Sequence, residues 1–189
     1  PEYDKIYCVS EPVRKQVIAR FPELADRTEV LLNFIDIKQV QRRSEEPLSD
    51  PQYTGELKFL TVGRASEEKG YDIAVQITAE LKKRGLCFKW FIIGDGRDLN
   101  KLRTMAKEYQ VEQEIIFLGM RENPAPYVKS CALYLQPSRH EGYPITIVEA
   151  RSLQKVIIAS DIPSMREQIR DGENGYLCPL DVMQFADKI

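Results

Sequence analysis

Residues 57–93 read LKFLTVGRASEEKGYDIAVQITAELKKRGLCFKWFII, with two short apolar segments separated by a glycine-bounded loop and an amphipathic segment. The apolar segments at 57–62 and 88–93 predict buried strands. Between them, residues 71–84 predict a helix, because apolar residues recur every four positions (Ile73, Ile77, Leu81) and Gly85 follows where the helix would stop. This is a strand–helix–strand unit, the building block of a parallel sheet.

The same alternation continues along the chain on both sides of this unit. Further strands are expected at 5–10, 29–35, 114–118, 132–136, 156–159 and 176–178. Helices are expected at 11–21, 98–109, 127–130, 144–153 and 163–170. Short apolar strands that alternate with helices are typical of an α/β, Rossmann-like fold, a parallel sheet with helices on both faces.

The composition changes between residues 38 and 55, where Gln, Arg, Ser, Glu and Pro dominate, and this predicts a solvated linker. We therefore interpret residues 1–54 as the end of one domain plus a linker, and residues 55–189 as a second domain. The chain starts at Pro1 rather than Met and stops within an expected helix at Ile189. We expect it to be an excerpt of a longer protein, truncated at its C-terminus.

The 189 residues are 43% hydrophobic and 30% charged with a net charge of −2, the balance of a soluble globular protein. This composition gives no electrostatic footprint for nucleic acid or an anionic membrane, and no apolar run is long enough to span a bilayer. The four cysteines are scattered, which argues against a zinc ribbon or a Cys-x-x-Cys redox site (Cys8, Cys87, Cys131, Cys178). Reduced, buried thiols indicate a reducing compartment, so we expect a cytoplasmic protein.

In parallel sheets, ligands bind in the loops that follow the carboxyl ends of the strands. The first such loop, Gly63–Gly70, holds two cations, Arg64 and Lys69, that could grip a diphosphate, and Gly63 would let the backbone approach it closely. The alternative is a solvated loop whose cations pair with Glu67 and Glu68. The second loop has Gly94 and Gly96 but Leu99 where a dinucleotide fingerprint needs a third glycine, so a tight turn is favoured over NAD binding.

The loop at 137–144 carries the most chemistry. Pro144 suits a first helical turn, and Gly142 before it would let the N–H groups of Tyr143, Ile145 and Thr146 point outward as an anion seat.

Two carboxylates stand eight positions apart in this region, Glu141 before the helix and Glu149 within it. Glu149 could accept bonds from the two hydroxyls of a ribose. Otherwise Glu141 would be a dipole partner and Glu149 a surface residue, although Glu149 lies amid apolar neighbours where an unpaired charge is costly. His140 is the only histidine, and a structural role is favoured for it because no base partner is evident.

Five motifs occur in order along the chain and together resemble one family. They are Gly63-Arg64 with Glu68-Lys69-Gly70, Gly94-Asp95-Gly96, Phe117-Leu118-Gly119, Glu141-Gly142-Tyr143-Pro144 with Glu149-Ala150, and Asp171-Gly172-Glu173-Asn174-Gly175. They resemble the C-terminal, donor-binding domain of the group 1 (family 4) retaining glycosyltransferases, which have the two-domain GT-B architecture. Many relatives carry a Gly-Gly pair where this chain has Pro163-Ser164, although Glu167 keeps its place.

The resemblance implies a role for each matched residue. Arg64 and Lys69 would contact the donor diphosphate, Glu149 would hold the ribose, and Glu141 would face the sugar. The backbone after Gly142 would support phosphate and sugar (Tyr143, Pro144, Ile145). The base would be bordered largely by main chain (Leu118, Gly119, Met120). We expect Arg64, Lys69 and Glu149 to converge on one cavity.

The resemblance implies transfer of a sugar, with retention, from a nucleotide-diphosphate sugar, most simply a UDP-sugar, to a glycan or lipid-linked acceptor. The catalytic set would be Glu141, Arg64 and Lys69, with no cofactor and no metal, in agreement with the lack of an Asp-x-Asp motif. The missing N-terminal domain would supply the acceptor site, and could contact the inner face of the membrane. Two alternatives are a non-catalytic nucleotide-binding module and a nucleotide-sugar epimerase on the same architecture.

Overall fold

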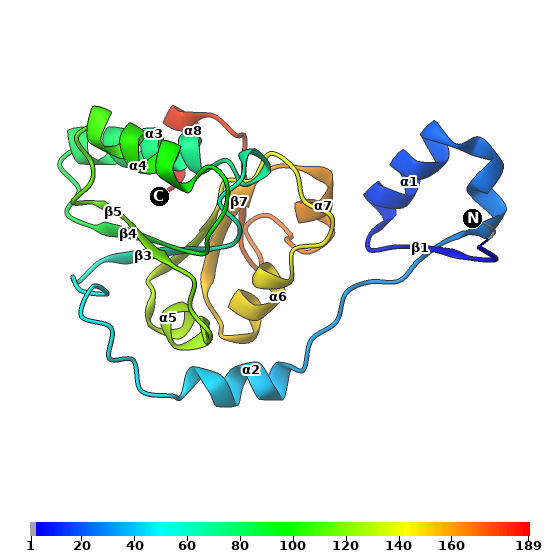
Figure 1. Cartoon of the computed structure of the whole chain (residues 1–189), viewed down its shortest axis with the longest axis horizontal. Helices are drawn as coiled ribbons and strands as arrows, with labels where there is room; N and C mark the ends of the chain where they lie inside the picture. The colour runs from blue at the N-terminus through cyan, green and yellow to red at the C-terminus, as the bar shows by residue number, and fades with distance from the viewer. Residues whose placement is uncertain (1–2) are drawn as a thin grey trace.

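The computed structural model describes residues 3–189 and shows a main body, built on a parallel sheet, beside a small N-terminal unit (Figure 1). Six strands form the main sheet in the order β5-β4-β3-β6-β7-β8, and every neighbouring pair is parallel. They are β3 (Lys58–Val62), β4 (Lys89–Ile93), β5 (Ile115–Gly119), β6 (Leu133–Gln136), β7 (Val156–Ser160) and β8 (Tyr176–Cys178). The predicted parallel sheet is confirmed, and its strand boundaries lie close to the predicted ones.

Helices cover both faces of the sheet, as the sequence predicts. One face packs against α3 (Tyr71–Lys83), α4 (Leu99–Glu108) and α8 (Val182–Lys188). The other packs against α5 (Ala125–Ser130), α6 (Ile145–Ser152) and α7 (Pro163–Arg166). Successive strand residues alternate between the two cores, since side chains of a strand point to opposite faces: Phe59 lies in the first core and Leu60 in the second.

The order in which strands are added to the sheet reverses between β3 and β6. From the central strand β3 the chain moves outward through β4 and β5, then returns to the other side of β3 to form β6, β7 and β8. The loops that follow β3 and β6 therefore leave the sheet side by side and turn to opposite faces. Such a switch point opens a crevice at the carboxyl edge, where ligands bind in folds of this kind.

The N-terminal unit consists of β1 (Ile6–Cys8), α1 (Glu11–Arg20), the 3-10 helix η1 (Pro22–Arg27) and β2 (Thr28–Val30). β1 and β2 pair in parallel, and the extended segment 31–36 joins the unit to the main body (Figure 1). The strand expected at 29–35 is wrong beyond Val30. Its partner β1 has only three residues, so the last ladder bond runs from the Leu31 N–H to the Cys8 carbonyl.

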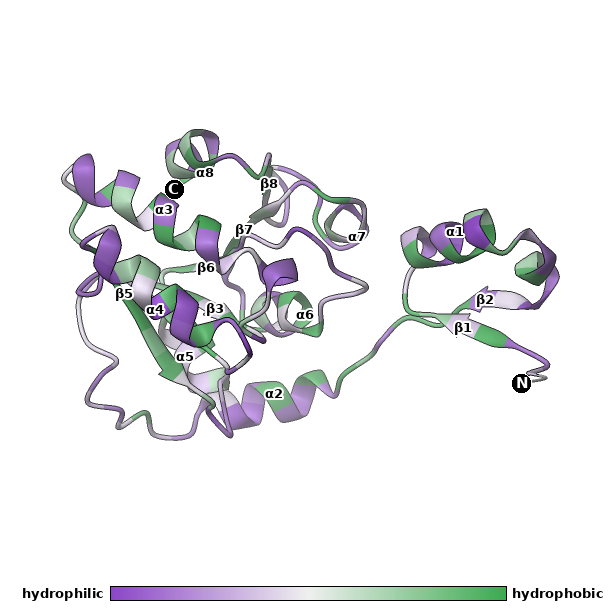
Figure 2. Ribbon diagram, turned by 45° about the horizontal axis from the view of Figure 1, so that its top comes forward, coloured by the Kyte–Doolittle hydropathy of each residue, from purple (hydrophilic) through white to green (hydrophobic). Residues whose placement is uncertain are grey.

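The solvated linker expected at 38–55 is wrong in its first part, where the structure has the helix α2 (Ile37–Ser44). Asp36 caps this helix by accepting a bond from the Gln39 N–H at 3.0 Å. Figure 2 shows polar and apolar residues alternating along α2, which packs against α5 and α6.

The helix expected at 163–170 ends at Arg166 as α7. The side chain of Asn174 accepts a bond from the Arg170 N–H at 2.7 Å. That bond takes the amide a longer helix would have used, so the helix stops early.

Candidate functional site

The loops after β3 and β6 meet at the switch point. The N–H groups of Arg139 and His140 donate to the Glu68 carbonyl at 2.8 and 3.2 Å. Gly70 has a φ of +67°, and a Cβ there would stand 1.9 Å from the Pro137 carbonyl oxygen. Only glycine allows this approach, which brings the loops after β3 and β6 together.

Lys69 and Glu141 form an ion pair across these two loops. The Lys69 Nζ lies 2.7 and 2.8 Å from the two carboxylate oxygens of Glu141. Gln136 and Ser138 also donate to this carboxylate, at 3.0 and 2.7 Å. The side chains of Lys69 and Glu141 are only 22% and 7% exposed, so the pair is largely shielded from water. Pairing of Lys69 with Glu67 or Glu68, the alternative interpretation, is not what the structure shows.

Arg64 is exposed at the mouth of β3 and lines a cavity of about 590 Å³ together with Ser66, Glu68, Lys69 and Arg97. Three of the five lining side chains are cations and one is an anion. The cavity is therefore suited to a multiply charged anion.

Gly63 stands over a buried hydroxyl. A Cβ at Gly63 would lie 2.8 Å from the Tyr71 Oη, so a larger residue would displace the tyrosine. Tyr71 is 1% exposed, and its hydroxyl has no hydrogen-bond partner among residues 3–189. Burial raises the pKa of Tyr71, with smaller contributions from Tyr134 and Glu141.

The start of α6 has the open amides that the sequence predicts. The helix begins at Ile145 after Pro144, and the N–H groups of Tyr143, Ile145 and Thr146 donate to no partner in the described part of the chain. Gly142 has a second role that the sequence does not predict. A Cβ at this position would lie 3.0 Å from Val9 Cγ2, so the glycine lets the N-terminal unit approach this loop.

Glu149 does not share a cavity with Arg64 and Lys69, so the predicted convergence on one cavity is wrong. Glu149 lines a separate cavity of about 240 Å³ between α2, α5 and α6, with Arg43 and Asn123 among its neighbours. Burial raises the pKa of Glu149, and Arg43 opposes this. Burial raises the pKa of Tyr134, and Glu149 and Glu141 both add to this, so both carboxylates act on the same buried side chain.

Leu118, Gly119 and Met120 lie at the carboxyl end of β5. Leu118 is buried, Gly119 has a φ of +74°, and Met120 is 71% exposed. Sequence reasoning missed the groups that hold this loop, Arg121 and Asp50. Burial alone would raise the pKa of Asp50, but bonds from Arg121, Gln52 and Tyr127 lower it below its ordinary value. Arg121 lies two residues after the Phe117-Leu118-Gly119 motif and could have been noticed, whereas no local signal marks Asp50.

The glycines after β4 act by close packing, in addition to forming a turn. A Cβ at Gly94 would lie 1.9 Å from the Gly63 carbonyl oxygen, and one at Gly96 would lie 2.2 Å from that of Ala65. The loops after β3 and β4 are thus packed backbone against backbone. His140 is exposed, and only its backbone N–H takes part in the loop contact.

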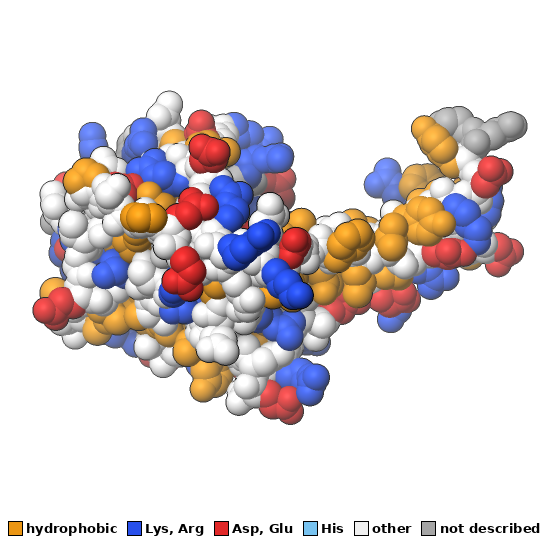
Figure 3. Space-filling model, turned by 90° about the horizontal axis from the view of Figure 1, so that it is seen from below, with side chains coloured by type: hydrophobic (Ala, Val, Ile, Leu, Met, Phe, Trp, Pro, Cys, Tyr) orange, Lys and Arg blue, Asp and Glu red, His pale blue; other side chains and the backbone are white. Residues whose placement is uncertain are grey.

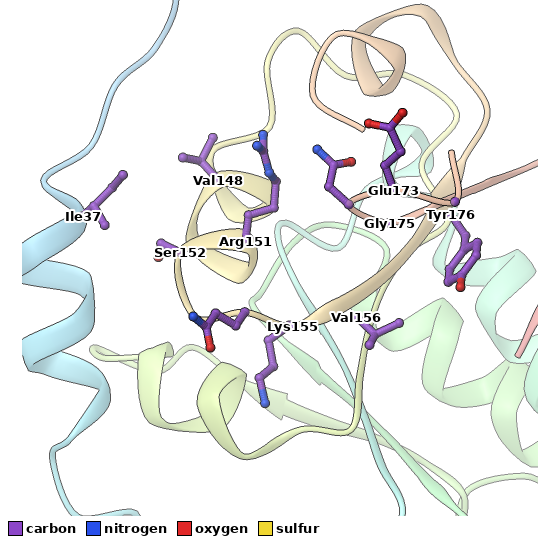
Figure 4. Close-up of a pocket in the computed structure, with 12 residues that line it drawn as sticks. Ile37, Val148, Arg151, Ser152, Lys155, Val156, Glu173, Gly175 and Tyr176 are labelled. Atoms are coloured by element: carbon purple, nitrogen blue, oxygen red, sulfur yellow. The ribbon is translucent and has the colours of Figure 1, made fainter. Parts of the chain in front are cut away.

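A larger cavity, of about 650 Å³, lies at the opposite edge of the sheet (Figure 4). Val156 and Tyr176, the first residues of β7 and β8, line it with Arg151 and Glu173. Lys155 in its wall is engaged in holding the carbonyls of Lys129 and Cys131. This cavity contains none of the predicted donor residues.

Among residues 3–189, no helix combines the length and the apolar character needed to cross a membrane. The same residues contain no cluster of three or more His, Cys, Asp or Glu side chains that could hold a metal ion.

Comparisons with known proteins agree on one family. Residues 43–189 match the family model described as glycosyl transferases group 1. An uncharacterized glycosyltransferase of Methanocaldococcus jannaschii is 29% identical over 193 residues, covering 100% of this chain and 45% of that protein. The lipopolysaccharide 1,6-galactosyltransferase of Salmonella typhimurium is 31% identical over 174 residues, covering 89% of this chain and 46% of that protein.

Among solved structures, the Anabaena protein HepE in complex with UDP and glucose superimposes with a TM-score of 0.81 at 19% identity, covering 98% of this chain and 52% of that one. At this identity the likeness shows the fold alone, which is that of GT-B glycosyltransferases. The chain spans about half the length of the relatives it matches. Since the family model covers most of the chain, from the end of α2 onward, the chain belongs to the group 1 glycosyltransferases.

Proposed function

We propose that this chain is the donor-binding part of a retaining glycosyltransferase and holds a nucleotide-diphosphate sugar at the switch point between β3 and β6. The observation that carries the proposal is the cationic cavity lined by Arg64 and Lys69 at the carboxyl edge, with Glu141 paired to Lys69. Membership of the group 1 family supports it.

The proposed chemistry follows from charge. Breaking a sugar–phosphate bond releases a nucleoside diphosphate and leaves an oxocarbenium-like sugar, so the barrier falls when fixed positive groups meet the departing negative charge. The Lys69 ammonium has three donors, and two of its contacts go to Glu141, which leaves capacity for a phosphate oxygen. Arg64 would supply a second cation, and the open amides of Tyr143 and Ile145 a third group of donors.

Glu141 is suited to face the sugar because its carboxylate is fixed. Gln136 and Ser138 donate hydrogen bonds to it, and these would hold the carboxylate in place when Lys69 moves to contact a phosphate. A fixed carboxylate beside the anomeric carbon would stabilise the positive charge that develops there. In this proposal the acceptor attacks from the face of the leaving group, with retention and without a metal ion or other cofactor.

The nucleoside would extend from the diphosphate toward Glu149 and the loop at Leu118, Gly119 and Met120. A carboxylate with a pKa raised by burial gains from accepting ribose hydroxyl bonds, which would offset its desolvation. UDP is the proposed nucleotide, and the solved Anabaena structure in complex with UDP supports it. A glycan or lipid-linked acceptor is supported by the lipopolysaccharide galactosyltransferase among the relatives.

The acceptor site is proposed to lie in the remainder of the full-length protein, because the chain spans about half of its relatives. We place the enzyme in the cytoplasm, at the inner face of the membrane when the acceptor is lipid-linked.

Calorimetric titration with UDP, GDP and ADP tests the donor site. We expect one nucleoside diphosphate to bind, and Arg64→Ala and Lys69→Ala each to weaken it about tenfold or more, as expected for loss of a charge-assisted bond to phosphate. Lys101→Ala, on an exposed face of α4, is the control. Failure of all three nucleotides to bind the unaltered chain would refute the donor site. Full-length protein that binds nucleotide yet transfers no labelled sugar would favour the non-catalytic module.

A further inference from the structure

The loop after β5 is fixed by Arg121, which is itself bound by the carboxylate of Asp50, a residue outside the main sheet. Asp50 Oδ2 accepts bonds from Arg121 Nε at 3.0 Å, Arg121 Nη2 at 2.7 Å and the Tyr127 hydroxyl at 2.9 Å. The Asp50 side chain is 10% exposed and that of Arg121 is 27% exposed, so both are largely withdrawn from water. An arginine fixed through two of its nitrogens by a buried carboxylate has little freedom to turn.

The remaining nitrogen of Arg121 is directed at the loop backbone. Arg121 Nη1 donates to the carbonyl oxygens of Leu118 and Met120, the latter at 3.1 Å. The carbonyl of Gly119 between them already accepts the Gly94 N–H at 2.9 Å. Three successive carbonyl oxygens in this loop are therefore engaged within the protein.

The N–H groups of the same loop are not engaged. Within residues 3–189, the amides of Met120, Arg121 and Glu122 have no hydrogen-bond partner. Met120 and Glu122 are exposed and Arg121 is half-buried, so the stretch lies at the surface. The loop thus leaves these donors free among the described residues while its acceptors are engaged within the protein.

The last turn of α2 holds the far end of the loop in the same way. Arg43 Nη2 donates to the Glu122 carbonyl at 3.0 Å, and Asn123 Nδ2 donates to the Arg43 carbonyl at 2.9 Å. Arg43 and Asn123 also line the cavity of Glu149. A nucleoside whose ribose is held by Glu149 would therefore have its base beside this loop.

We propose that Asp50 and Arg121 are positioning residues that set the base selectivity of the donor site. By occupying the carbonyls of Leu118 and Met120 they leave a row of donors, which matches a base with carbonyl oxygens on its edge and disfavours one that offers an amino group. Uracil has two carbonyl oxygens and adenine has none, so the site would select uridine over adenosine nucleotides. This inference rests on the proposed donor site, and neither residue needs to touch the nucleotide.

The test compares UDP with ADP in calorimetric titrations of the 189-residue chain and four variants. Arg121→Lys keeps the charge but cannot bridge Asp50 to two carbonyls, and Asp50→Asn removes the carboxylate that orients the arginine. The matched controls are Arg84→Lys and Asp187→Asn, because Arg84 Nη1 contacts Asp187 at 2.6 Å in a pair that touches no loop carbonyl. Thermal unfolding of each variant is measured beside the titrations.

We expect the unaltered chain to bind UDP more tightly than ADP. Arg121→Lys and Asp50→Asn should reduce the ratio of UDP to ADP affinity about tenfold, the effect of misplacing one or two hydrogen bonds. The two controls should leave the ratio unchanged. A purely structural role would instead lower the unfolding temperature and weaken both nucleotides equally.

The inference is overturned if the ratio is unchanged in both test variants, if both nucleotides weaken equally, or if the unaltered chain prefers ADP. If the unaltered chain binds no nucleotide at all, the proposed donor site itself is refuted. That result comes from the unaltered chain alone, so it is distinguishable from failure of the inference about Asp50 and Arg121.

Discussion

At the level of single residues, the Lys69–Glu141 pair links the two halves of the candidate site. Its side chains are 22% and 7% exposed, so loss of one partner leaves the other charge poorly solvated. We expect Lys69→Met and Glu141→Gln each to lower the free energy of unfolding by about 2 kcal/mol. The double variant should cost less than the sum, with a coupling of about 1–2 kcal/mol in urea denaturation.

The exposed pair Lys5–Glu29 provides the control for this cycle, since both side chains are about half exposed. Its coupling should be clearly smaller, because solvent screens it. Equal coupling in the two cycles would contradict a shielded pair at the site.

Glu149 should be unfavourable for stability when ionised. Burial raises its pKa in the folded chain above the ordinary value of 4.5. The folded state therefore holds the proton to higher pH than the unfolded state, so stability is lost as pH rises from the unfolded pKa to the folded one. Glu149→Gln should raise the unfolding temperature at pH 7 and have a smaller effect at pH 4.

The same variant should bind UDP about tenfold more weakly if the carboxylate holds the ribose. Glu112→Gln, on an exposed loop, is the control and should change neither property. If Glu149→Gln lowers the unfolding temperature at pH 7, then burial of the charge is not the dominant effect.

At the level of elements, the loops after β3 and β4 depend on a glycine contact that can be tested by a matched pair. Gly94 has a φ of +139° and a Cβ there would stand 1.9 Å from the Gly63 carbonyl oxygen. Gly85, after α3, also has a positive φ, of +80°, but a Cβ there would meet nothing within 4 Å. Both positions strain an alanine, and only Gly94 adds a collision.

We expect Gly85→Ala to cost about 1–2 kcal/mol from backbone strain alone. Gly94→Ala should cost about 4 kcal/mol or more, or abolish cooperative unfolding in urea. Similar costs for the two variants would show that the loops can separate without penalty.

The elements that the sequence predicts well are those that are buried in the sheet, because burial requires a run of apolar residues. The central strands are apolar on both faces, as in Phe91, Ile92 and Ile93, so their positions follow from the sequence alone. The helix α2 was not predicted because only one of its residues, Ser44, is buried. It is stabilised by contacts distant in sequence, such as the bond from Gln41 to the Ser152 carbonyl at 3.2 Å. Its one local signal is the cap Asp36, which is weak without an apolar face beside it.

At the level of the whole molecule, strand topology explains which parts of the site could be predicted. Arg64, Lys69 and Glu141 follow strands that turn out to be neighbours, and the carboxyl-edge rule brings their loops together. The ion pair itself was not predicted, because it depends on the tight approach of Gly70 to Pro137. The Asp50–Arg121 contact joins residues 71 positions apart through a segment that has no regular structure, so no sequence period indicates it.

The N-terminal unit touches the main body at the edge of the candidate site. Glu167 accepts a bond from the Glu11 N–H, at the start of α1, at 3.1 Å. Asn33 Nδ2 donates to the Tyr143 carbonyl at 3.4 Å, and Val9 lies against Gly142. The contacts of Asn33 and Val9 fall on the loop that follows β6, and that of Glu11 falls at the end of α7, so the position of the unit and the shape of the site are coupled.

The segment that joins the two parts is apolar and exposed. Figure 3 shows hydrophobic side chains gathered along it, and Leu31, Leu32 and Phe34 are 56%, 46% and 87% exposed. Such side chains in extended backbone are substrates for thermolysin. We expect the first cut within residues 31–35, which would release the main body, because local opening there breaks few contacts. Mass spectrometry of a digestion time course identifies the site.

Glu167→Ala should speed this first cut about threefold, the effect of losing one charge-assisted bond at the surface. The cut is favoured whenever the N-terminal unit moves off the main body, and Glu167 opposes that movement by capping α1. Glu173→Ala, which removes an exposed carboxylate away from α1, should leave the rate unchanged. A first cut within residues 55–189, or equal rates in the two variants, would show that the unit is not held to the main body through Glu167.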